Sequence, residues 1–319
     1  MKINLGNYLE GLERGADTVL ITGSCGPCRF GYYGIVQKEI LEEKGIPLEV
    51  IVLDPPQGEL KAFFTRIKKA AGNRSWTLIA RSMRRSIDLA KKADELERAV
   101  FFSRPREVHY GDTDKVYSHY QQDILRAKGW LEMKEVLNHY RDELRRIPLD
   151  AGRDPLRIGI IGEIYTIIEP FVNLNTEQKL GSMGVHVDRS IMVSTWIFEN
   201  LIYRALGQTT EKDIRDAASP YLDRCIGGHA WECIGNAVRY SQKGYDGAIQ
   251  ILPFGCMPEI VAESILPTVA RDHNFPVMTL VVDEMTGEAG YCTRLEAFVD
   301  LLEQRRRRKM LDDKLLPGY

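Results

Sequence analysis

The 319-residue chain lacks several features that would assign it at once to a known class. No apolar stretch approaches the ~20 residues that a membrane-spanning helix needs. The N-terminal residues show neither the apolar core nor the small-residue cleavage pattern of a secretory signal. The 43 basic and 45 acidic residues nearly cancel, so no overall positive charge indicates nucleic-acid binding. We therefore expect a cytoplasmic protein that binds neither membranes nor nucleic acids.

The usual nucleotide-binding loops are also missing. The sequence contains no G-x-x-x-x-G-K-[ST] motif, so we expect no P-loop for ATP in this chain. The stretch 158–162 reads IGIIG, which lacks the G-x-G-x-x-G spacing, and its glycines precede Glu163 rather than the start of a helix. The sequence therefore gives little support for a nicotinamide-binding site.

Short apolar segments alternate with amphipathic ones in two blocks, as in proteins with parallel sheets. The strands expected from this pattern are 18–22, 48–53, 157–165, 191–196, 247–252 and 277–282. Between the blocks, charged residues recur at helical spacing and continuous β patterns are nearly absent. The sequence predicts an α/β protein with two flavodoxin- or Rossmann-like parallel-sheet domains and a helical insert. The expected boundaries are 1–60 for the first α/β domain, 61–150 for the helical insert or cap, and 151–319 for the second α/β domain.

The chain has six cysteines, and in a protein expected to be cytoplasmic these favour ligands or redox thiols over disulfides. Cys25 and Cys28 form a C-x2-C pair directly after the first expected strand, while Cys256 and Cys292 each fall between a strand and a helix. Parallel strands end at one edge of a sheet, and ligands collect outside that edge. We therefore expect these thiols to converge on one site.

Further candidates accompany these cysteines. Cys225 and Cys233 flank a Gly-Gly-His turn, and His229 in that turn is a candidate ligand or hydrogen-bond donor to a bound group. Glu163 and Glu259 follow strand ends on the same expected edge, which makes them candidates for proton delivery. For Glu259, a carboxylate stabilised by a helix N-terminus explains the position equally well.

Several kinds of site use a C-x2-C pair, including zinc sites, iron–sulfur clusters and redox dithiols. A structural zinc ion needs four ligands in a closed tetrahedron and would leave two of the six cysteines unexplained. The glycines beside the cysteines also allow backbone amides to approach a bulky ligand. These observations favour an iron–sulfur cluster, with a zinc or dithiol protein as the rival.

Four stretches resemble one protein family. They are CGPCRFGYYG at 25–34, IGEIYTIIEPFVNLNTEQKLGSMGV at 161–185, LPFGCMPEIVAESILP at 252–267 and GEAGYCTRLEAF at 287–298. They resemble proteins related to the activase and dehydratase components of the 2-hydroxyacyl-CoA dehydratase system, in particular the activase-associated domain found alone or fused behind the ATP-dependent activase. The resemblance spans most of the chain except the helical insert.

This resemblance implies an oxygen-sensitive iron–sulfur protein with tandem flavodoxin-like domains, and relatives suggest a homodimer. Its electrons would come from an ATP-hydrolysing activase that carries its own [4Fe-4S] cluster. Double-cubane relatives hold an [8Fe-9S] cluster with three cysteines on each cubane. Carried over to this chain, the implied ligands are Cys25, Cys28, Cys225, Cys233, Cys256 and Cys292.

The leading hypothesis is therefore an ATP-coupled, low-potential iron–sulfur reductase or electron-transfer protein with a double-cubane cluster. One rival is a dehydratase-type component with a single [4Fe-4S] cluster and an acyl-CoA substrate, although we recognise no acyl-CoA pocket in the sequence. Another is a non-catalytic cluster carrier that docks on an activase through the helical insert or the basic run Arg305–Lys309.

Overall fold

The computed structural model describes residues 2–22, 30–53, 60–198, 212–224 and 226–315. The chain divides into two compact units, of which the first is built mainly from residues up to Arg84 and the second mainly from Arg85 onward. Each unit contains helices and one parallel sheet, which confirms the predicted mixture of helices and parallel strands.

The first unit is built around a two-stranded parallel sheet with flanking helices. Its elements up to the second strand are α1 (Lys2–Glu13), β1 (Thr18–Thr22), α2 (Phe30–Glu43) and β2 (Glu49–Leu53). The strands pair from Thr18↔Glu49 to Thr22↔Leu53. Ile21, Leu41 and Val50 are buried between sheet and helices. The predicted strand–helix–strand start of the chain is thus present.

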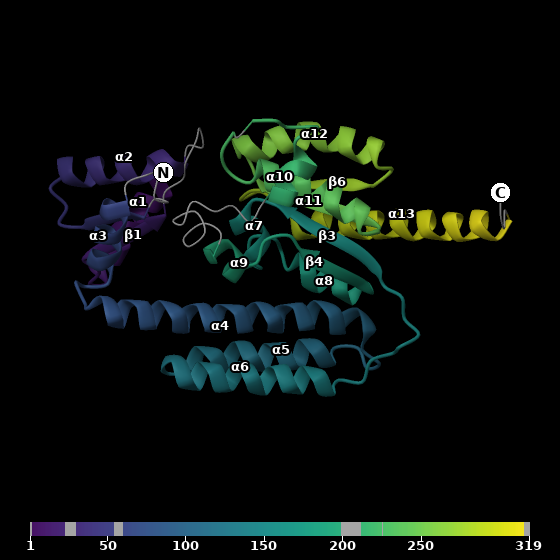
Figure 1. Cartoon of the computed structure of the whole chain (residues 1–319), viewed down its shortest axis with the longest axis horizontal. Helices are drawn as coiled ribbons and strands as arrows, with labels where there is room; N and C mark the ends of the chain where they lie inside the picture. The colour runs from purple at the N-terminus through teal and green to yellow at the C-terminus, as the bar shows by residue number, and fades with distance from the viewer. Residues whose placement is uncertain (1, 23–29, 54–59, 199–211, 225, 316–319) are drawn as a thin grey trace. The chain divides into compact units, whose positions relative to one another are not determined.

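The segment predicted as a helical insert is largely helical. Its elements are α3 (Leu60–Ala70), α4 (Trp76–Ser103), a 3-10 turn (Arg104–Arg106), α5 (Asp112–Arg126) and α6 (Gly129–Arg146). Residues up to Arg84 belong to the first unit, and the remainder belongs to the second. Within the second unit, α5 and α6 lie side by side next to α4 (Figure 1), and Leu96, Tyr120 and Leu137 are buried between these helices.

The second unit contains a four-stranded parallel sheet in the order β4-β3-β5-β6. Its strands are β3 (Leu156–Gly162), β4 (Val185–Arg189), β5 (Gly247–Pro253) and β6 (Val277–Val282). The helices between and after them are α7 (Ile164–Ile168), α8 (Thr176–Ser182), α9 (Val193–Ile197), α10 (Lys212–Ala218), α11 (Ala230–Gln242), α12 (Met257–Asp272) and α13 (Glu288–Leu315). β3 and β5 occupy the centre, so their apolar side chains are almost completely buried.

One predicted strand is wrong. The segment 191–196 was expected to be extended, but the neighbour of β3 is β4, and residues 193–197 form the short helix α9. A contact distant in sequence accounts for this helix: the Ser194 amide, near the N-terminus of α9, donates a hydrogen bond of 2.9 Å to Asp94 Oδ2 on α4. Tertiary contacts therefore override the β-branched and aromatic character of this stretch.

The two glycines of the IGIIG stretch have structural roles in β3. A Cβ atom on Gly159 would lie 2.3 Å from the ring of Tyr240, so this glycine allows α11 to pack directly on the sheet. Gly162 has φ +136°, and a Cβ there would lie 2.0 Å from the carbonyl oxygen of Ile251 on β5. Close packing accounts for both glycines without a bound dinucleotide.

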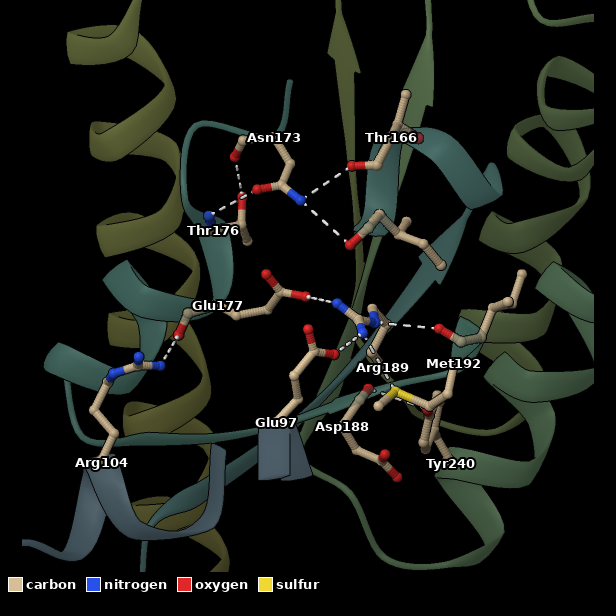
Figure 2. A network of polar contacts seen from close by, with 12 residues as sticks. Glu97, Arg104, Thr166, Asn173, Thr176, Glu177, Asp188, Arg189, Met192 and Tyr240 are labelled. Atoms are coloured by element: carbon tan, nitrogen blue, oxygen red, sulfur yellow. Dashed lines mark hydrogen bonds and ion pairs between the residues drawn. The ribbon is translucent and has the colours of Figure 1, made fainter. Parts of the chain in front are cut away.

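A buried ion network joins α4 to the end of β4 (Figure 2). Arg189, the last residue of β4, is 5% exposed and forms ion pairs with Glu97 of α4 and Glu177 of α8. The Glu177 contact measures 3.1 Å, and Arg189 Nε donates a further hydrogen bond of 3.2 Å to the carbonyl of Ile191. Helix α4 is therefore joined to the carboxyl end of β4 by a buried ion pair network.

Within the described ranges, no helix is both long enough and apolar enough to cross a membrane.

Candidate functional site

Several predicted site residues lie at the carboxyl edge of the four-stranded sheet. Glu163 directly follows β3, Cys256 and Glu259 follow β5, and Cys292 lies in the first turns of α13 after β6. Since the strands are parallel and adjacent, their carboxyl ends share one edge. The order along the sheet thus brings together four residues that are far apart in sequence.

Glu259 is the most unusual residue at this edge, because its side chain is 0% exposed. Gln250 Nε2, from the middle of β5, donates 2.9 Å to Glu259 Oε2 and 3.0 Å to the Glu259 backbone carbonyl. Thr279 Oγ1 of β6 in turn donates 3.1 Å to Gln250 Oε1, which fixes the orientation of that amide. Oε1 of Glu259 has no hydrogen-bond partner among the described residues.

This environment favours the neutral form of the Glu259 carboxyl group. Burial raises its pKa to about 7, the nearby charge of Glu163 contributes in the same direction, and hydrogen bonds from Gln250 and Cys233 act against the shift. Glu259 therefore exchanges its proton near neutral pH, which is the property expected of a group that accepts and returns protons at physiological pH.

Glu163 combines a structural role with a raised pKa. It is the N-cap of α7, and its Oε2 accepts a hydrogen bond of 3.0 Å from the Thr166 amide. Thr166 Oγ1 donates 2.8 Å to the Glu163 carbonyl and 3.1 Å to the carbonyl of Ile251 on β5. Burial raises the pKa of Glu163, while the hydrogen bonds from Thr166 and Tyr165 oppose that shift. The carboxyl groups of Glu163 and Glu259 are near enough to interact electrostatically.

The three described cysteines differ in position. Cys256 is the N-cap of α12 and Cys292 lies one turn into α13, and both are partly exposed. Cys233 was predicted in a turn but lies inside α11, where it is 1% exposed. Burial and the negative charge of Glu259 raise the pKa of the Cys233 thiol well above its usual value. None of the three forms a disulfide.

The other predicted ligands are His229 and three cysteines outside the described residues. His229 is the N-cap residue of α11 and is partly buried, but its side chain does not cap the helix. Cys25, Cys28 and Cys225 lie outside the described residues. Within the part of the chain that the structure describes, no group of three or more His, Cys, Asp or Glu side chains is arranged to hold a metal ion.

Gln250 and Thr279 are site residues that sequence reasoning missed. A signal for Gln250 was available, because it is the only polar residue in the strand sequence GAIQILP of β5. A buried polar side chain must find a partner, so its presence in a central strand indicates a polar group nearby. Thr279 carries no comparable signal, because threonine is common in strands.

Neither a family model nor a curated protein matches the chain.

Proposed function

We propose that this protein is an iron–sulfur protein for ATP-coupled, low-potential electron transfer or for reduction of a small substrate. Its electrons would come from a partner activase that hydrolyses ATP and carries a [4Fe-4S] cluster. The proposal includes two flavodoxin-like domains, a cytoplasmic location and a homodimer without nucleic-acid partners. The observation that carries it is the position of Cys256 and Cys292, two partly exposed thiols that follow the adjacent parallel strands β5 and β6.

The chemistry of the donors supports this proposal for two of the described cysteines. Cys256 precedes α12, a helix of 16 residues whose N-terminus stabilises negative charge such as that of a thiolate. Cys292 lies near the start of the helix after the neighbouring strand, with its thiol partly exposed. Cys233 does not fit in the same way, because its thiol is enclosed and its surroundings disfavour the thiolate.

When bound, a cluster would supply one-electron transfer, and the chain's own residues would supply protons and position. Glu259, with a pKa of about 7, and Glu163, with a raised pKa, are proposed to hold protons at the sheet edge beside the cysteines. His229 is proposed to donate a hydrogen bond near the same site. Cys25, Cys28 and Cys225 complete the proposed ligand set on the basis of the family resemblance.

Exposed apolar side chains at the same edge support docking of a partner there. Phe254, directly after β5, is 78% exposed, and Met285, after β6, is 83% exposed. Tyr165, in the short helix α7 that follows β3, is also exposed. Large apolar side chains grouped at one edge are typical of surfaces that a partner or ligand covers.

Two cluster types are proposed. The resemblance favours an [8Fe-9S] double cubane that uses all six cysteines. The burial of Cys233 favours the second candidate, a single [4Fe-4S] cluster in a dehydratase-type component or in a non-catalytic cluster carrier.

Iron and acid-labile sulfide per chain, measured after purification without oxygen, test the proposal. About eight iron atoms support the double cubane, and about four support the single cubane. Cys256→Ala is expected to lose most of the bound iron, whereas Ser264→Ala, on an exposed position of the same helix, should keep it. A colourless wild-type protein with negligible iron would refute the proposed function.

A further inference from the structure

Cys233 occupies a position from which its thiol does not reach the surface. It is the fourth residue of α11, and its backbone amide donates 2.8 Å to the carbonyl of His229, so it already belongs to the regular helix. The residues that follow it in the helix, Ile234 to Val238, are all buried. The thiol faces inward, near the side chains of Glu259 and Gln250.

Helix α11 has little freedom to turn this thiol outward. A Cβ atom on Gly235 would lie 2.2 Å from the backbone carbonyl oxygen of Ile214, so α10 and α11 are in direct backbone contact there. On the other side, the ring of Tyr240 fills the space above Gly159 of β3. Rotation of α11 about its axis would break both contacts, and exposure of Cys233 therefore requires local unfolding of the unit.

The electrostatic surroundings also oppose iron ligation at this position. Iron–sulfur clusters are ligated by thiolates, so a ligand must be deprotonated. Cys233 has the carboxyl groups of Glu259 and Glu232 nearby, and both disfavour a second negative charge. The thiol instead stabilises the charged form of Glu259 as a weak hydrogen-bond donor.

We infer that Cys233 is not a cluster ligand but an enclosed packing thiol of α11, beside Glu259 at the carboxyl edge of the sheet. This inference rests on the proposed function. It leaves five of the six cysteines for iron and so one too few for a double cubane with three cysteines on each half. Four thiolates suffice for a single [4Fe-4S] cluster, which is therefore the cluster that the remaining cysteines can complete.

Iron content of cysteine variants tests this inference directly. In protein purified without oxygen, Cys233→Ala and Cys233→Ser are expected to keep the iron per chain and the visible spectrum of the wild type. Cys256→Ala is the matched control and is expected to lose most of its iron. Loss of iron from both Cys233 variants to the extent seen with Cys256→Ala, while far-UV circular dichroism stays unchanged, would overturn the inference.

If a Cys233 variant does not fold, alkylation of the wild-type chain tests the same inference. Iron is removed with a chelator under nitrogen, the native apoprotein is treated with iodoacetamide, and each cysteine is followed by peptide mass spectrometry. Cys233 should react at least about tenfold more slowly than Cys256 and Cys292 until urea unfolds the chain, because its thiol is exposed only by opening. Reaction at a comparable rate would overturn the inference.

The outcomes separate the two proposals. If the wild-type protein holds no iron, the proposed function fails, and the alkylation rates still show whether Cys233 is enclosed. If the wild type holds iron that Cys233→Ala and Cys233→Ser lose, the function stands and the inference fails.

Discussion

Replacing the buried carboxyl group of Glu259 by an amide should stabilise the protein in a pH-dependent way. The pKa of Glu259 is about 7 in the folded chain, against 4.5 for an ordinary glutamate. Between these values the folded chain holds a proton that the unfolded chain has released, so the folded state is destabilised as the pH rises. Above about pH 7 both states are ionised and the effect is constant.

The size of this effect follows from linkage. The pKa of Glu259 differs by about 2.5 between the folded and unfolded chains, so its ionisation lowers the free energy of unfolding by at most about 3.4 kcal/mol. About 2.5 kcal/mol of this loss falls between pH 5 and pH 8. Glu259→Gln has no proton to release, while its amide oxygen can still accept the hydrogen bond from Gln250. The free energy of unfolding of the variant should therefore rise by about 2.5 kcal/mol relative to the wild type between these pH values.

Urea unfolding followed by far-UV circular dichroism at pH 5, 6, 7 and 8 measures this difference. Subtracting the wild-type curve removes the contribution of titrating groups that do not interact with Glu259. Glu296→Gln, an exposed position on α13, is the matched control and should show no such trend. A difference between Glu259→Gln and wild type that is constant with pH would show that Glu259 is ionised in the folded chain at all these pH values.

Two further predictions concern stability. Arg189→Met should lower the free energy of unfolding by about 3–5 kcal/mol in the same urea assay, because it leaves the buried carboxyl group of Glu177 and the partly exposed one of Glu97 without their cation; a loss under about 1 kcal/mol would mean that the network contributes little. Gly162→Ala should cost more than about 2 kcal/mol, because its Cβ would overlap the carbonyl of Ile251, whereas Gly6→Ala, with open space in helix α1, should raise stability by about 0.5–1 kcal/mol. Equal thermal midpoints for the two glycine variants would contradict this reasoning.

The strands that could be predicted from sequence are those with a continuous run of apolar residues. β5 and β6 are predicted correctly as 247–252 and 277–282, because both sequences are almost continuously apolar. β4 reads VHVDR, with polar residues at alternate positions. That pattern is a weaker strand signal than the β-branched stretch 191–196 that follows it, so the sequence favours the wrong segment.

The sequence predicts where several candidate residues lie along the sheet, but not how deeply their side chains are buried. A parallel sheet fixes which chain segments reach its carboxyl edge, so Glu163, Cys256 and Cys292 could be assigned to that edge from sequence alone. Whether a side chain there faces solvent or the interior depends on the packing of helices on one another. The burial of Cys233 follows from the contact between α10 and α11, which no spacing of cysteines records.

The complete burial of Glu259 supports a functional role for the carboxyl edge of the sheet. At pH 8 its ionised carboxyl group costs about 3 kcal/mol, and glutamine would avoid that cost while keeping the hydrogen bond from Gln250. A residue that lowers stability in this way is typical of functional sites, where activity requires a group that packing alone disfavours. Glu259→Gln should therefore be more stable at pH 8 but slower in any proton-coupled reduction, with its iron content unchanged. Full turnover in the variant would mean that the buried acid has no catalytic use.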